Sequence, residues 1–104
     1  MKRGLWLLLM LSLLVPAAAA RDYTVIQKGR AFHPDTITIH VGDTIKFAND
    51  DQFLHQIYVD SSAIAYDSRE QPPGEVLSTT FPVAGTFKVR CHIHPKMLLI
   101  VHVK

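Results

Sequence analysis

Apolar and polar residues alternate along most of the chain beyond residue 21, and this pattern limits the fold more than any other feature of the sequence. In segments 36–41 and 44–47 every second residue is apolar, and Phe87, Val89 and Cys91 repeat the pattern later in the chain. A period of two residues is typical of a strand with one buried face. The β-branched and aromatic residues that fill these segments also favour strands. The sequence therefore predicts an all-β fold.

Turn residues divide the alternating pattern into short strands. Gly42-Asp43, Pro72-Pro73-Gly74 and Ala84-Gly85 lie between apolar segments, and glycine, proline and aspartate are the residues that turns prefer. Short strands separated by turns are typical of an antiparallel sandwich or barrel. We expect about seven strands, near residues 23–28, 36–41, 44–49, 55–60, 76–81, 85–91 and 98–104.

The first 20 residues have the composition of a secretory signal peptide. Lys2 and Arg3 are followed by an apolar run over 5–15, by Pro16 and by four alanines that end at Ala20. A basic start, an apolar middle and small residues at the end are the three parts of such a signal, and the run is shorter than the about 20 residues of a membrane span. We expect a cleaved signal over 1–20, a single domain over 21–104 and a periplasmic location.

Charge and cysteine content narrow the possible functions of the domain over 21–104. Without Lys2 and Arg3, nine cationic side chains balance nine acidic ones, so the domain has no basic surface that would favour nucleic acid or, after cleavage, a membrane. Cys91 is the only cysteine, which excludes an intramolecular disulfide. Because small domains have thin cores and often need a staple, a metal ion is the candidate stabiliser.

The metal donors predicted from the sequence lie mostly near the end of the chain. Cys91, His94 and Met97 recur at spacings of three residues, and His55 begins an apolar strand upstream. A hairpin loop after Cys91 would let the three converge, and Pro95 would stiffen it. One thiolate, two imidazoles and a weak axial thioether form the ligand set of a blue-copper electron-transfer site.

Other interpretations of these donors stay open. Cys91 alone could be an inert buried thiol. Cys91, His55 and His94 would also suit tetrahedral zinc, although the thioether of Met97 is a poor zinc ligand. We expect His92 to face solvent or to form a hydrogen bond rather than to bind metal.

The remaining polar residues predict no catalytic chemistry. His33, His40 and His102 have no spacing that points to the donor cluster, and Asp50 and Asp51 follow an asparagine between two strands, where they read as turn residues. No nucleophilic triad is present, and a metal-bound thiolate is not free to attack a substrate. The sequence therefore predicts a protein that is not an enzyme.

The ordered set His55, Cys91, His94 and Met97 resembles the ligand set of the cupredoxins, in particular the plastocyanin, pseudoazurin and amicyanin group. The spacing from Cys91 to Met97, with Pro95 after the histidine, is most similar to the amicyanin loop. The segment 41–47 is similar to the family's strands, and 73–75 and 85–87 to its approach to the cysteine. The resemblance covers nearly all of the domain and implies a Greek-key β-sandwich with one copper ion bound by these four residues.

The same resemblance implies a function. The resemblance implies a carrier of single electrons. We expect a monomer that meets a transient redox partner, which is a dehydrogenase, a cytochrome or another copper protein. His94 would be the surface port for the electron, within an apolar collar of Leu54, Pro95 and Phe53. The alternative is a protein of copper delivery or tolerance that uses the same four ligands.

Two residues depart from the family pattern. Many relatives have proline before the first histidine ligand and asparagine after it, whereas this chain has Leu54 and Gln56. The resemblance implies that this asparagine ties the two ligand loops together and donates toward the thiolate. In this chain Gln56 stands at the position of that asparagine.

Overall fold

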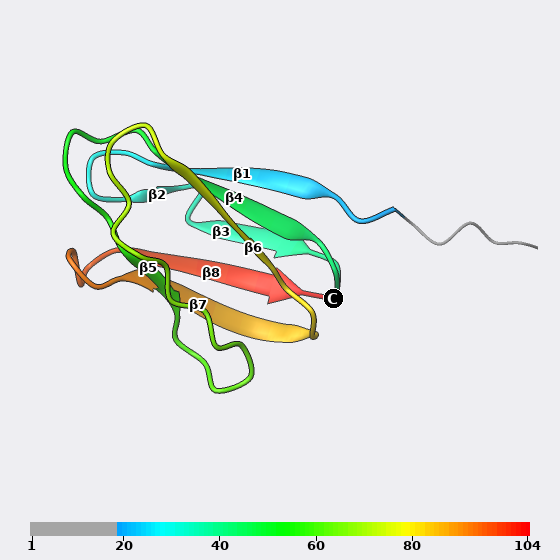
Figure 1. Ribbon diagram of the computed structural model, residues 1–104. Helices are drawn as coiled ribbons and strands as arrows, with labels where there is room; N and C mark the ends of the chain where they lie inside the picture. The colour runs from blue at the N-terminus through cyan, green and yellow to red at the C-terminus, as the bar shows by residue number, and fades with distance from the viewer. Residues whose placement is uncertain (1–18) are drawn as a thin grey trace, which may run out of the picture.

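The computed structural model describes residues 19–104 as a β-sandwich (Figure 1). The predicted signal peptide over 1–20 therefore lies outside the described residues, except for its last two. Within 19–104 every regular element is a strand, and no helix has the length and apolar character needed to cross a membrane. The strands are β1 (Asp22–Gln27), β2 (Phe32–His33), β3 (Thr36–Ile39), β4 (Thr44–Asn49), β5 (Ile57–Val59), β6 (Val76–Thr80), β7 (Gly85–Cys91) and β8 (Leu98–Val103).

The eight strands form two four-stranded sheets, in the orders β2-β1-β4-β6 and β3-β8-β7-β5. Parallel pairs join β1 to β4 and β3 to β8, and the other pairs are antiparallel. The prediction of an all-β sandwich is confirmed. Figure 1 shows that the β1–β2 turn and the β7–β8 hairpin lie at the same end of the sandwich, opposite to the C-terminus.

The apolar residues of the alternating pattern form the core between the sheets. In β4 and β8 every second residue is buried, because successive side chains of a strand point to opposite faces. The core is a single cluster of apolar side chains from both sheets, and it includes two residues of the predicted site, Cys91 and Met97. One end of this core is therefore also the place where the donors lie.

The structure contains one strand that the sequence pattern does not predict. Phe32 and His33 pair with Ile26 and Gln27 as β2, and Pro34 follows at once. A two-residue strand is too short to show a period of two, and a proline cannot donate a ladder hydrogen bond. The count of seven was therefore one short.

Two predicted strands are shorter than expected by two residues or more. The one near 36–41 ends at Ile39, where the chain turns over His40 to Asp43. The one near 55–60 is regular only over 57–59, because His55 pairs with Gln71 through an isolated bridge. His55 thus lies just outside the regular sheet, in a segment that side chains must hold in place.

The turn before β4 depends on the carboxylate of Asp43, which is buried (3% exposed). Its two oxygens accept the backbone N–H groups of Arg21 and His40, both at 2.8 Å. These bonds, the one from Arg21 first, lower the pKa of Asp43 below its ordinary value of 3.8 against the opposing effect of burial. The ionised form therefore stabilises the folded state.

Asp43→Asn should lower the stability of the metal-free protein at neutral pH, since the amide cannot accept both N–H groups. Because the folded pKa is depressed, the Asp43 contribution is fully present above pH 3.8 and is lost as the pH falls below it. Urea unfolding from pH 7 to pH 2.5 would measure the difference between the two proteins. Asp22→Asn, on an exposed carboxylate, is the control, and a difference for Asp43→Asn that stays constant with pH would contradict the prediction.

Candidate metal centre

Two of the predicted ligands meet where β5 and β7 pair. Cys91 ends β7 and lies opposite Ile57 in the ladder, and His55 lies two residues before the start of β5. The Cys91 Sγ atom lies 3.5 Å from His55 Nδ1. Both side chains are buried, with exposed fractions of 1% and 0%. The sheet register therefore brings a thiol and an imidazole together inside the protein.

The other two predicted ligands lie on the hairpin between β7 and β8. The His94 ring contacts the His55 ring at a centroid distance of 5.1 Å. Met97 is buried (2% exposed), and its N–H donates to the His94 carbonyl at 3.0 Å. This bond turns the loop so that Met97 enters the core while His94 stays partly exposed. The structure thus gathers all four predicted ligands at one end of the sandwich.

The donors are grouped but do not form a closed shell. Among residues 19–104, no three His, Cys, Asp or Glu side chains stand in an arrangement ready to hold a metal ion. Nε2 of His94 is buried without a hydrogen-bond partner, which is costly for a polar atom unless a ligand satisfies it. With a thiol, two imidazoles and a thioether, the donor set fits copper.

Asp51 holds the His55 ring from the side opposite to Cys91. Its Oδ2 lies 2.8 Å from His55 Nε2, and the carboxylate is 7% exposed. When Nε2–H donates to this carboxylate, Nδ1 carries the lone pair and faces the thiol, as a metal-binding histidine requires. The sequence suggested a turn residue, but Asp51 also orients the ring of a proposed ligand.

The β1–β2 turn holds Asp51 in place. Gly29 and Arg30 have φ values of 63° and 56°, which is the left-handed conformation of a two-residue hairpin. Their N–H groups donate to the Asp51 carboxylate at 2.6 and 3.3 Å. Burial raises the pKa of Asp51, but the bonds from His55, Gly29 and Arg30 outweigh it, so that the pKa lies below its ordinary value.

Phe53 packs against both histidine rings. Its ring centroid lies 5.4 Å from that of His55 and 5.0 Å from that of His94, in edge contacts, and the Arg30 guanidinium lies 4.9 Å above the Phe53 ring. Burial, the neighbouring His55 and the Arg30 charge lower the pKa of His94, against a bond to the Leu54 backbone. His94 is therefore neutral at physiological pH, which a metal ligand must be.

The buried residue Gln71 holds the backbone of His55 through its own backbone. The N–H of His55 donates to the Gln71 carbonyl at 3.1 Å, and the N–H of Gln71 donates back at 2.7 Å. The Gln71 side chain donates to the carbonyls of Phe47 and Glu75 and accepts from Gln27. Gln71 is fully buried, and it anchors His55 where the β5 ladder does not reach.

The residue after His55 contacts the thiol through its backbone. The Gln56 N–H donates to Cys91 Sγ at 3.4 Å, while its side chain donates to Asp67 at 3.1 Å. His92 bonds to the other oxygen of Asp67 at 2.8 Å, which agrees with the hydrogen-bonding role expected for it. His33, His40 and His102 contact Lys28, Asp43 and Thr86, away from the donor cluster.

Sequence reasoning missed Asp51, Gln71 and Asp67. One signal was available for Asp51, because histidine ligands almost always donate their second ring N–H to a carboxylate or carbonyl. Asp51 lies four residues before His55. Gln71 and Asp67 lie in the irregular segment between β5 and β6, where the sequence pattern indicates no partner.

Comparison with known proteins places the chain among copper proteins. The family model described as "Copper binding proteins, plastocyanin/azurin family" matches residues 20–104. Plastocyanin from Scenedesmus fuscus is 31% identical over 72 residues, which are 61% of this chain and 74% of that protein. Several other plastocyanins match over only 47–50% of their own length.

Solved structures show the same fold. A reduced form of an amicyanin mutant superposes with a TM-score of 0.74 at 24% identity, and the match covers 85% of each chain. A copper-containing nitrite reductase (NirK) from Thermus scotoductus has a TM-score of 0.73 at 30% identity, over 80% of this chain but 22% of the enzyme. The chain thus matches one part of that larger protein.

Asp51→Ala should weaken copper binding by about 10- to 100-fold, because the His55 ring would lose the bond that orients it. Competition with a chelator of known affinity would measure the change in the dissociation constant. Asp50→Ala is the matched control, since Asp50 is the exposed neighbour whose side chain pairs with Lys28 and not with a histidine among residues 19–104. Equal affinities for the two variants would show that Asp51 does not support the site.

Proposed function

Because the chain belongs to the plastocyanin/azurin family of copper-binding proteins, we propose that it is an exported carrier of single electrons, with His55, Cys91, His94 and Met97 as the ligands of one copper ion. When bound, copper supplies a one-electron Cu(I)/Cu(II) couple. The observation that carries the ligand assignment is the 3.5 Å contact of Cys91 Sγ with His55 Nδ1, a buried thiol–imidazole pair beside the His94 ring.

The environment of these residues supports electron transfer. Three of the proposed ligands are buried. The core holds Met97, Asp51 bonds to the His55 ring, and the Gln56 N–H donates to the Cys91 sulfur. Because these contacts hold the donors in place, the geometry of the site should change little when the charge of the metal changes. Hydrogen bonding at the cysteine sulfur also tunes the reduction potential of such sites. Electron transfer through these donors requires no substrate pocket, and we propose that the protein has no enzymatic activity.

The surface around His94 suits a transient partner. Leu54 and Ile93 are 39% and 41% exposed, and Pro95 is also exposed, so that apolar side chains surround the one partly exposed ligand. An apolar surface of this kind suits the weak contacts of redox proteins. The chain would act as a monomer that meets its partner here.

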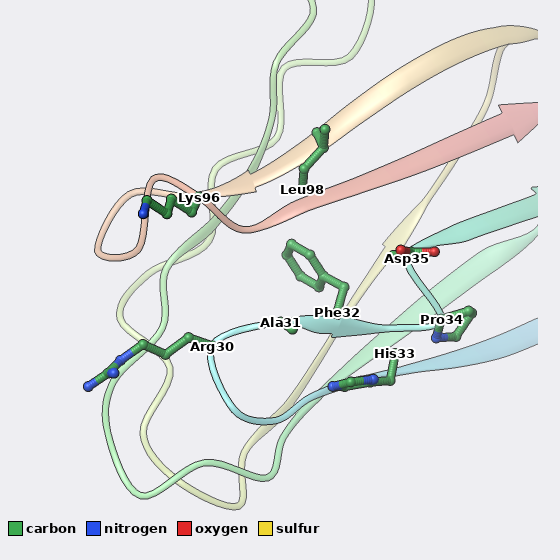
Figure 2. A pocket seen from close by; sticks show the side chains of 8 residues that line it. All are labelled: Arg30, Ala31, Phe32, His33, Pro34, Asp35, Lys96 and Leu98. Carbon is green, nitrogen blue, oxygen red and sulfur yellow. The ribbon is translucent and has the colours of Figure 1, made fainter.

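Two cations border this surface. Arg30 and Lys96 lie on opposite sides of a hollow lined also by Phe32 and Leu98 (Figure 2). Neither is within 4.0 Å of a carboxylate among residues 19–104, where the ion pairs involve other side chains. A partner surface with acidic groups would complement them.

The proposal of export rests on the predicted signal over 1–20, whose cleavage would leave a mature chain that begins at Arg21. The structure makes Arg21 part of the fold, because its N–H donates to the buried Asp43 and its carbonyl accepts from Thr44. A periplasmic location suits this proposal. Mass spectrometry of the protein secreted from the full chain would give the mass of residues 21–104 if the cleavage site is right.

Cys91→Ser should abolish the intense visible absorption of the Cu(II) protein, because that band requires a bond between the thiolate and copper. Visible and electron paramagnetic resonance spectra of residues 21–104 loaded with Cu(II) would measure it. His33→Asn, which changes a histidine outside the site, should leave the band unchanged. A band that persists in Cys91→Ser would refute the ligand assignment.

Copper exchange distinguishes the carrier from a protein of copper delivery or tolerance that uses the same ligands. Three of the four ligands are buried, so copper should leave slowly when a Cu(I) chelator is added in excess. Stopped-flow mixing of the reduced protein with chelator would measure the rate. Release as fast as chelator binding to free Cu(I) would favour delivery instead.

A further inference from the structure

Asp67 contacts the neighbours of two proposed ligands without contacting a ligand itself. It lies in the irregular segment between β5 and β6, where Oδ1 accepts the side-chain amide of Gln56 at 3.1 Å and Oδ2 lies 2.8 Å from His92 Nε2. Gln56 directly follows His55, and His92 directly follows Cys91. One carboxylate thus joins the segment of the first ligand to the loop of the other three.

The backbones of the two segments are joined at the same place. The N–H of His92 donates to the Gln56 carbonyl at 2.9 Å, and the N–H of Gln56 donates to Cys91 Sγ at 3.4 Å. The Asp67 carboxylate is therefore connected to the thiol through a single residue, Gln56, whose side chain bonds to Asp67 and whose N–H bonds to the sulfur. Any movement of Gln56 away from His92 would also lengthen the N–H···S bond.

Asp67 is held well enough to serve as a fixed point. It forms an isolated β-bridge with Tyr58. On either side of it, the Tyr66 carbonyl accepts from the Val59 N–H at 3.0 Å and the Ser68 N–H donates to the Ile57 carbonyl at 2.7 Å. The segment is irregular in conformation, yet at this point it is bonded to β5 on both sides of Asp67.

The His92 ring is also fixed. It stacks flat on Tyr58, with ring centroids 3.9 Å apart and an angle of 14° between the planes. The bond from His92, and then that from Gln56, lower the pKa of Asp67, so its carboxylate is ionised at neutral pH. The stacked ring presents its nitrogen to a charged acceptor, which makes the hydrogen bond stronger than one between neutral groups.

We propose that Asp67 is a positioning residue of the metal centre, which clamps Gln56 to His92 and so keeps the Gln56 N–H against the Cys91 thiolate. This inference rests on the proposed function for the identity of the ligands. Asp67 and His92 are 53% and 43% exposed, and an exposed ion pair by itself stabilises a fold little. The role proposed is therefore local, at the sulfur, rather than a contribution to overall stability.

Amide hydrogen exchange of the metal-free protein tests the clamp directly. Asp67→Ala should accelerate exchange of the Gln56 and His92 amides by about fivefold or more, the factor that corresponds to about 1 kcal/mol. The matched control is Asp60→Ala. Asp60 is similarly exposed (57%) and joins the end of β5 to β7 through Arg90 at 3.4 Å. Arg90 directly precedes Cys91, so this ion pair also lies beside a ligand, but the side chains of Gln56 and His92 bond to Asp67 and not to Asp60. That variant should leave both amides unchanged.

A second variant separates the hydrogen bond from the ring stack. His92→Phe keeps a ring on Tyr58 but removes the bond to Asp67, and it should accelerate exchange of the Gln56 amide as Asp67→Ala does. The double variant should show little further change, because both substitutions remove one interaction. Additive effects, or an Asp67→Ala variant that matches Asp60→Ala, would overturn the proposal.

The copper-loaded protein supplies a readout at the sulfur. Asp67→Ala should shift the visible thiolate–copper band and speed copper loss to a chelator by about tenfold, whereas Asp60→Ala should do neither. If the native protein shows no such band, the proposed function fails, while the exchange experiment still decides whether the clamp exists. An unshifted band together with unchanged amides would refute the clamp and leave the proposed function intact.

Discussion

The contact between the Cys91 sulfur and the His55 ring is the interaction on which the rest of this end of the molecule depends. A fully buried imidazole is tolerated only if its nitrogens have partners. Nδ1 faces the thiol and Nε2 faces Asp51. Asp51 in turn needs donors, which the β1–β2 turn supplies. Hydrogen bonds thus connect the buried pair, through Asp51, to the turn at Gly29 and Arg30.

The two sheets and the loops contribute differently to the site. The pairing of β5 with β7 sets where Cys91 lies relative to the chain that leaves His55. His94 and Met97 depend instead on the loop between β7 and β8, closed by a backbone bond between them. Residues outside the ligand set support both parts: Gln71 bonds to the backbone of His55, and the Asp67 side chain joins Gln56 to His92 on the loop. Such support keeps ligands near one geometry without a large core.

Much of the fold and of the proposed site could be predicted because the relevant signals are local in sequence. Alternation revealed seven strands, and it failed for β2, which is too short to alternate. The spacing of Cys91, His94 and Met97 brought attention to one loop, and the structure gathers these residues with His55. Asp51 lies only four residues before His55, yet the sequence pattern indicates only a turn there. Asp67 bonds to His92, which lies 25 residues further along the chain in a segment that sequence reasoning cannot place beside it.

The sequence by itself determined the strand class, the donor types and the family, because the period of a strand and the spacing within one hairpin are properties of a few consecutive residues. Only the tertiary structure decided which polar residues support the donors. The order of strands in the two sheets brings the β1–β2 turn to Asp51 and the segment after β5 to Gln56 and His92. Hydrogen bonds act over about 3 Å, so their partners are chosen by the packing of distant segments and leave no periodic trace in the chain.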